Sequence, residues 1–200
     1  MQIINENNIL AVKTACQLLR DGKVIALPTD TVYGLAVDAS NQQAVDDLYN
    51  LKKRDKAKPI AIFLKDINQI KNFFEIEKTT QDLIDKYLPG KLTIVAPLKN
   101  NLQLNFAKNL NLIDKNFLGF RVIDSFFVKN LLQEFNGAIA VSSANLTANK
   151  VAISALEIKK YFDKIDLIVD GNILSTTPST VLKVDNSRIT IIRQGAVEIK

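Results

Sequence analysis

The chain has 200 residues and a mass of 22.3 kDa, so we expect a single domain over residues 1–200 and exclude a multidomain assembly. Its residues are 47% hydrophobic and 24% charged, which is typical of globular proteins and excludes a disordered chain. The net charge of +5 is compatible with an anionic ligand or with RNA.

The first part of the chain alternates between helical and extended patterns. Apolar residues recur at helical spacing over residues 8–20, and Gly22 follows where a C-terminal cap is expected. Residues 23–27 form a short apolar run that Pro28 ends, which predicts a buried strand. Asn41 can cap a second helix that continues to Leu51.

The remaining elements follow from similar patterns. Asp66 can cap a helix ending near Phe74, and Thr79 or Thr80 can cap another that Pro89 and Gly90 close. Residues 99–116 show no clear period and are expected to be irregular. Strands are predicted over residues 59–64, 92–98, 118–123, 138–141, 167–169, 180–184 and 189–192, and helices near residues 126–134 and 154–162. Alternating units followed by closely spaced strands predict an α/β fold with a twisted mixed β-sheet flanked by helices.

Several kinds of chemistry are excluded by residues that are absent or rare. The chain has no histidine, which excludes Ser-His-Asp and Cys-His catalysis and histidine-based zinc sites. Cys16 is the only cysteine, so we expect no internal disulfide and interpret it as a core residue of a protein in a reducing compartment. The glycines form neither a dinucleotide fingerprint nor a Walker A loop. No secretory signal or membrane span is recognised, and a cytoplasmic location is expected.

Three clusters rich in hydroxyl groups follow predicted strands: residues 28–31, 142–145 and 178–180. Ligands of open α/β sheets usually bind in loops beyond strand ends, where hydroxyls and backbone N–H groups can hold a polar ligand or a phosphate. Each cluster taken alone is better explained by turns and helix caps, which favour the same residue types. Together they indicate a binding site.

A basic turn over residues 52–58 carries five cations and one anion. Such a run is often only a solvated helix end, but Lys52 and Arg54 could converge on one phosphate chain. Arg121 and Arg193 each close an apolar strand run, so each is expected to face an anion or a structural ion-pair partner.

Seven segments stand in a fixed order between about residue 23 and residue 195: LPTDTVYGLAVDA, LKKRDKAKPIAIFL, LPGKLTIV, GFRV, VSSANLT, PSTVL and IIRQGA. In this order and spacing they resemble the YrdC-like threonylcarbamoyl-AMP synthase family. The family's signature is a Lys-x-Arg pair with a Ser-x-Asn pair, here Lys52 with Arg54 and Ser143 with Asn145. The chain stops soon after the last motif, so it resembles the short, single-domain form.

This resemblance implies a nucleotidyltransferase that makes L-threonylcarbamoyl-AMP from L-threonine, bicarbonate and ATP and releases pyrophosphate. The product would supply the N6-threonylcarbamoyladenosine modification of tRNA, which downstream tRNA-modification proteins complete. The implied fold is a twisted mixed sheet with helices around a basic concave surface. Mg2+ is expected to accompany ATP, and no residues are assigned to a metal site.

The resemblance also implies roles for individual residues. Lys52 and Arg54 would be catalytic, and the threonine would be held by Thr31, Arg121 and Ser179. The residues implied for ATP binding are Arg54, Lys58, Ser143, Asn145 and Arg193. Because a carbamate must attack the phosphate chain, the main tasks are charge neutralisation and alignment, which fixed cations and Mg2+ can perform without histidine.

Three positions depart from the family pattern. Thr147–Ala148 stand where the family commonly has Ser-Gly, Ser125–Phe126 where it has His-Pro, and Phe63 where a histidine is frequent. These changes concern the threonine pocket. Two alternatives stay open from the sequence: a non-catalytic module that binds tRNA or double-stranded RNA through a basic face, and a related carbamoyl-transfer domain detached from a larger hydrogenase-maturation protein.

Overall fold

A computed structural model describes residues 1–99, 106–108, 110, 116–146, 150–171 and 177–199. Ten strands in this part of the chain form one mixed sheet. They are β1 (Gln2–Asn5), β2 (Ile25–Leu27), β3 (Gly34–Asp38), β4 (Ala61–Leu64), β5 (Leu92–Pro97), β6 (Phe117–Val122), β7 (Ile139–Ser143), β8 (Leu167–Asp170), β9 (Thr180–Asp185) and β10 (Arg188–Arg193). Six helices are described: α1 (Ala11–Arg20), α2 (Gln42–Leu51), α3 (Ile67–Phe73), α4 (Lys78–Tyr87), α5 (Phe126–Phe135) and α6 (Ala155–Tyr161).

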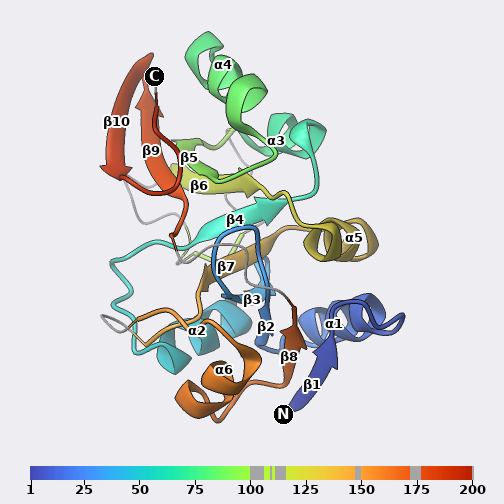
Figure 1. Ribbon diagram of the computed structural model, residues 1–200. Helices are drawn as coiled ribbons and strands as arrows, with labels where there is room; N and C mark the ends of the chain where they lie inside the picture. Colours follow the sequence, from blue (N-terminus) through green and yellow to red (C-terminus); the bar gives the residue numbers. More distant parts are fainter. Residues whose placement is uncertain (100–105, 109, 111–115, 147–149, 172–176, 200) are drawn as a thin grey trace.

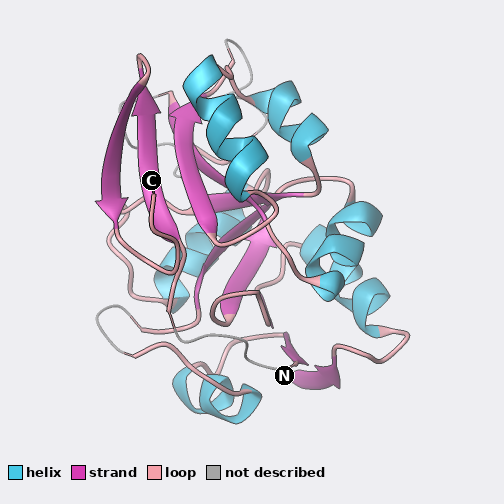
Figure 2. Cartoon of the chain, turned by 45° about the horizontal axis from the view of Figure 1, so that its top comes forward, coloured by secondary structure: helices cyan, strands magenta, loops and turns pink. Residues whose placement is uncertain are grey.

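The strand order is β1-β8-β2-β3-β7-β4-β6-β5-β9-β10, so the two ends of the described chain lie at opposite edges of the sheet (Figure 1). Four neighbouring pairs are parallel (β1 with β8, β2 with β8, β4 with β6, β5 with β9) and the others are antiparallel. The predicted α/β fold with a mixed sheet flanked by helices is therefore confirmed (Figure 2).

Helix boundaries follow local capping chemistry. The Asn41 side chain accepts from the Ala44 N–H at 3.1 Å, as predicted for α2, and Asp66 likewise caps α3. The predicted cap at Thr79 or Thr80 is wrong, because α4 begins at Lys78 and its N-cap residue is Glu77, in an extended conformation. The Glu77 carboxylate does not cap the helix and instead accepts hydrogen bonds from Ser187.

The first helix is shorter than predicted. The backbone N–H of Ala11 donates to the Asn8 carbonyl, and the Asn8 side chain accepts from the Leu10 N–H, so residues 8–10 form a turn and α1 begins at Ala11. Gly22 follows the helix with φ of +72°, the left-handed conformation that glycine adopts without strain. Cys16 is buried on the inner face of α1, as expected for a core residue.

Apolar residues on alternate positions of the strands build a core on each face of the sheet. On β3, Leu35 and Val37 belong to the core beneath α2, α3, α4 and α6, whereas Ala36 belongs to the core beneath α1 and α5. The core beneath α1 and α5 involves mainly the strands β2, β3, β7 and β8. On this side, α1 and α5 leave the adjoining strands β4, β6, β5 and β9 with a face that a ligand can reach.

Candidate active site

A cavity of about 340 Å³ lies on this less covered face, within the usual size range of small-molecule sites. Strand alternation determines its floor: Ala61 and Phe63 of β4 line it, whereas Ile62 between them belongs to the opposite core. Six residues predicted from the sequence line the cavity: Thr31, Arg54, Arg121, Ser143, Ser179 and Arg193. Segments that are distant in the chain therefore meet around one hollow.

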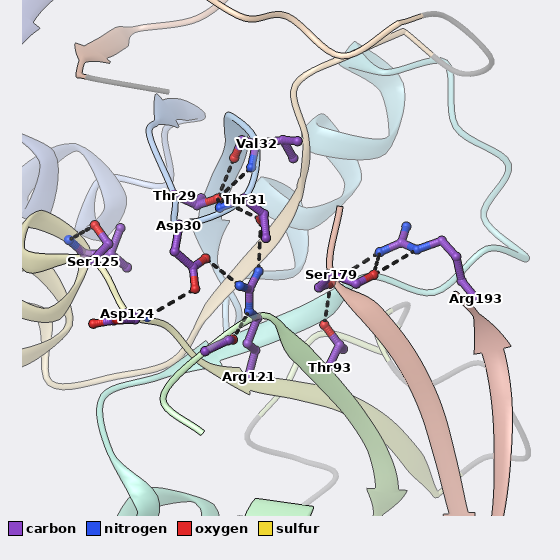
Figure 3. A network of polar contacts seen from close by, with 12 residues as sticks. Thr29, Asp30, Thr31, Val32, Thr93, Arg121, Asp124, Ser125, Ser179 and Arg193 are labelled. Atoms are coloured by element: carbon purple, nitrogen blue, oxygen red, sulfur yellow. Dashed lines mark hydrogen bonds and ion pairs between the residues drawn. The ribbon is translucent and has the colours of Figure 1, made fainter. Parts of the chain in front are cut away.

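Arg121 is held at the floor by a set of buried polar contacts (Figure 3). Its Nη2 forms an ion pair with Asp30, its Nη1 donates to the Thr31 hydroxyl at 3.1 Å, and its Nε donates to the Gly90 carbonyl at 2.7 Å. The guanidinium also lies 5.7 Å from the centre of the Phe63 ring. The expected partner of Arg121 is thus a carboxylate of the protein itself.

Burial dominates the electrostatics of this ion pair. It raises the pKa of Asp30, although the adjacent Arg121 opposes that shift, and it lowers the pKa of Arg121. The Asp30 carboxylate also accepts from the Asp124 backbone N–H at 3.4 Å. Asp30 was not among the predicted site residues, although it stands beside Thr31 in the first hydroxyl-rich cluster.

The first cluster has a structural member as well. The Thr29 hydroxyl donates to the Val32 carbonyl at 2.5 Å and accepts from the backbone N–H groups of Thr31 and Val32. These bonds make the turn that brings Thr31 to Arg121. For Thr29 the turn-forming alternative therefore describes the hydrogen bonds, although both Thr29 and Thr31 line the cavity.

Ser179 and Arg193 meet at the far wall of the cavity (Figure 3). Arg193 donates to the Ser179 carbonyl from Nη2 at 2.8 Å and from Nε at 3.2 Å. The Ser179 hydroxyl lies 2.9 Å from the Thr93 hydroxyl of β5. The pKa of Arg193 is lowered mainly by partial burial of its guanidinium and, to a smaller extent, by repulsion from Arg54. Thr93 was missed, but a lone threonine at an alternate position of an apolar strand could have indicated it.

The Lys-x-Arg and Ser-x-Asn pairs are joined by direct hydrogen bonds. Lys52 Nζ donates to the Ser143 carbonyl, to the Asn145 carbonyl at 2.8 Å and to Asn145 Oδ1 at 3.1 Å. The Ser143 hydroxyl also donates to Asn145 Oδ1, at 2.7 Å. Burial, with a smaller contribution from Arg54, lowers the pKa of Lys52 to about 7. Of these three residues, Ser143 lines the cavity and the other two do not.

Arg54 fixes the end of the basic turn by donating to two backbone carbonyls. Its Nε donates to the Lys58 carbonyl at 3.0 Å and its Nη2 to the Pro59 carbonyl at 2.9 Å, while the side chain lines the cavity. Lys58 is exposed and does not line the cavity. The sequence predicted that the basic turn faces a phosphate chain as one cluster. In the structure Arg54 lines the cavity and Lys58 does not.

Two of the three departures from the family pattern lie in described residues. Phe63 lies beside the Arg121 guanidinium, and Ser125 caps α5 by accepting from the Val128 N–H, which leaves Phe126 exposed. Thr147–Ala148 fall outside the described residues.

Neither a metal cluster nor a membrane-spanning helix is found in the described part of the chain. No group of three or more His, Cys, Asp or Glu side chains is placed to hold a metal ion there. No helix among these residues is long and apolar enough to cross a membrane.

Comparisons with known proteins agree with this arrangement. The Sua5/YciO/YrdC family model, described as "Telomere recombination", matches residues 17–195. The chain is 30% identical to a putative threonylcarbamoyl-AMP synthase of Methanocaldococcus jannaschii, over 90% of this chain and 83% of that protein. It is 33% identical to the threonylcarbamoyl-AMP synthase of Mus musculus, over 84% of this chain but only 58% of that protein. The crystal structure of P. abyssi Sua5 complexed with L-threonine superimposes with a TM-score of 0.87 and 25% identity, covering 98% of this chain and 58% of that chain.

Proposed function

Because the chain belongs to the Sua5/YciO/YrdC family, we propose that it is an L-threonylcarbamoyl-AMP synthase. The observation that carries this proposal is the convergence of Arg54, Ser143 and Arg193 with Thr31 and Arg121 around one cavity. Proteins of this name are similar over most of the chain, so an enzyme is favoured over a non-catalytic RNA-binding module.

The reaction converts L-threonine, bicarbonate and ATP into threonylcarbamoyl-AMP, pyrophosphate and water. The threonine amine and bicarbonate first form a carbamate, and a carbamate oxygen then attacks the α-phosphorus while pyrophosphate leaves. Both reacting partners are anions, so fixed positive charge and alignment lower the barrier. Mg2+ bound to ATP would neutralise part of the phosphate charge.

Two groups of cavity residues support different tasks. We assign Arg54, Ser143 and Arg193 to the nucleotide. Lys52 and Asn145 hold Ser143 through hydrogen bonds. Lys58 is assigned to the outer phosphates. Because Lys52 donates to the Ser143–Asn145 segment, its part in catalysis is to fix that segment.

The second group suits an amino acid. We assign Thr31, Arg121 and Ser179 to L-threonine. A guanidinium has five N–H groups, and three of those on Arg121 are used by Asp30, Thr31 and Gly90. The remaining two can donate to the threonine carboxylate. Asp30 balances the buried charge when no substrate is present.

In this proposal the whole of residues 1–200 acts as one domain in the cytoplasm. Threonylcarbamoyl-AMP is a mixed anhydride with an activated carbamoyl group, so it must be consumed by an acceptor. We propose that this acceptor is adenosine of tRNA, reached through downstream tRNA-modification proteins.

Pyrophosphate release by the purified protein tests the function. We expect release from ATP that requires both L-threonine and bicarbonate, and the formation of threonylcarbamoyl-AMP detected by mass spectrometry. Release that needs neither co-substrate would contradict the assignment. Salt-sensitive tRNA binding without any turnover would favour the RNA-binding module instead.

A further inference from the structure

A network beside the cavity holds Ser179 and Arg193 in place. Thr180 follows Ser179 and is fully buried. Its hydroxyl donates to the Val197 carbonyl at 2.6 Å and accepts from the N–H groups of Gly195 at 3.0 Å and Val197 at 3.1 Å. One side chain thus uses three hydrogen bonds to tie the end of the chain to the start of β9.

The backbones of the two segments also touch. The Ala196 N–H donates to the Pro178 carbonyl at 3.0 Å. A Cβ atom on Gly195 would lie 2.4 Å from the Pro178 carbonyl oxygen and 2.4 Å from the Ser179 carbonyl carbon. Both are backbone atoms, so a larger residue at position 195 would have to displace the Ser179 peptide.

We propose that Thr180 and Gly195 are positioning residues, which hold Ser179 and Arg193 in the geometry that binds both substrates. This inference rests on the proposed function. The Ser179 carbonyl accepts two hydrogen bonds from the Arg193 guanidinium, so a shift of this peptide redirects that side chain. The same shift separates the Ser179 hydroxyl from Thr93.

The arrangement links the two substrates. Arg193 is assigned to the nucleotide and Ser179 to threonine, yet their side chains lie 3.3 Å apart, from Nη2 to Oγ. Any displacement of residues 178–180 therefore weakens both sites together. A residue that only stabilised the fold would lower the melting temperature without this joint effect on affinity.

The test uses a nearly isosteric change and its conservative counterpart. We expect Thr180→Val, which removes the hydroxyl, to raise KM for both threonine and ATP about tenfold or more, with kcat changed less than about threefold. Thr180→Ser keeps the hydroxyl and should stay within about threefold of the wild-type KM values. Thr190→Val removes an exposed hydroxyl from β10 and serves as the matched control, with wild-type kinetics.

Gly195→Ala provides an independent test, because it moves the Ser179 peptide and leaves every hydroxyl in place. It should raise the same two KM values, and calorimetry should show the matching loss of threonine affinity. Circular dichroism and thermal unfolding establish that each variant is folded at the assay temperature. Wild-type KM values in folded Thr180→Val and Gly195→Ala proteins would overturn the inference.

The remaining outcomes are equally decisive. If both variants fail to fold, or lose kcat with unchanged KM, the residues have a structural role and the inference is wrong. If the wild-type protein releases no threonine-dependent pyrophosphate, the proposed function fails. If the wild type is active and both variants keep its KM values, the positioning role is wrong but the proposed function stands.

Discussion

At the residue level, Arg54 lines the cavity, and its guanidinium forms no ion pair with a carboxylate of the residues that the structure describes. It donates to two backbone carbonyls and repels Arg193 across the cavity. Replacing it with alanine removes a charged contact to ATP worth about 1.5–3 kcal/mol, so Arg54→Ala should weaken ATP binding roughly 10- to 150-fold in calorimetry. The control is Lys56→Ala in the same turn, an exposed residue paired with Asp46 and outside the cavity lining. Equal affinities for both variants would refute the role of Arg54.

Lys52 gives the protein a pH dependence with a definite sign. Its pKa is about 7 in the folded protein and near the ordinary lysine value of 10.5 when unfolded. Between these values the unfolded chain binds the proton more tightly, so this residue makes the free energy of unfolding rise with pH by up to about 1.4 kcal/mol per unit. Urea titrations from pH 7 to about 10 should show a flatter slope for Lys52→Met than for the wild type. Lys53→Met, at the exposed neighbouring position, should keep the wild-type slope.

The site could be predicted in composition more than in geometry. Hydroxyl clusters after strands, isolated arginines in apolar runs and the basic turn together indicated six of the lining residues. Spacing along the chain does not fix where a long side chain points. Lys52 therefore turned out to donate to the Ser143 carbonyl and not to line the cavity, and Asp30 was overlooked because a turn also explains it.

At the level of elements, α2 positions the basic turn and depends on a single side-chain cap. Asn41 Oδ1 accepts from the Ala44 N–H, and Lys52 is the residue at the other end of the helix. Asn41→Ala should lower the free energy of unfolding by about 0.5–2 kcal/mol, whereas Asn41→Ser, which keeps a capping oxygen, should lose much less. Chemical denaturation of the three proteins measures the difference. Identical losses for alanine and serine would show that the cap contributes little.

Elements with a strong local signal were predicted and two weaker ones were not. Side-chain caps begin the helices α2, α3 and α5, at Asn41, Asp66 and Ser125, and clear apolar periodicity follows each cap. This combination makes a helix predictable from local sequence. Strand β1 is mostly exposed at the sheet edge, so it lacks an apolar pattern, and β3 begins at a glycine directly after a turn. Each is a strand because of its pairing partners: β1 pairs with β8, and β3 pairs with β2 and β7. A local sequence pattern does not contain this information.

At the level of the whole molecule, the sheet has a fully buried centre and an exposed edge. Ile62 of β4 is completely buried beneath the helices, on the face opposite the cavity, whereas Ile189 of β10 is 40% exposed. Ile62→Ala should lower the free energy of unfolding by about 2–5 kcal/mol through lost burial and a residual cavity. Ile189→Ala should cost less than about 0.5 kcal/mol. Urea denaturation that gave equal losses would contradict this description of the core.

The parallel pairing of β5 with β9 has a consequence for biosynthesis. Residues 92–95 lie alongside residues 180–183, and Ser179 and Arg193 complete a wall whose other parts are made much earlier. A nascent chain that has emerged only as far as β8 presents β5 without this neighbour and the hollow without its far side. The ability to capture substrate should therefore arise abruptly, once β9 and β10 have been synthesised and have docked.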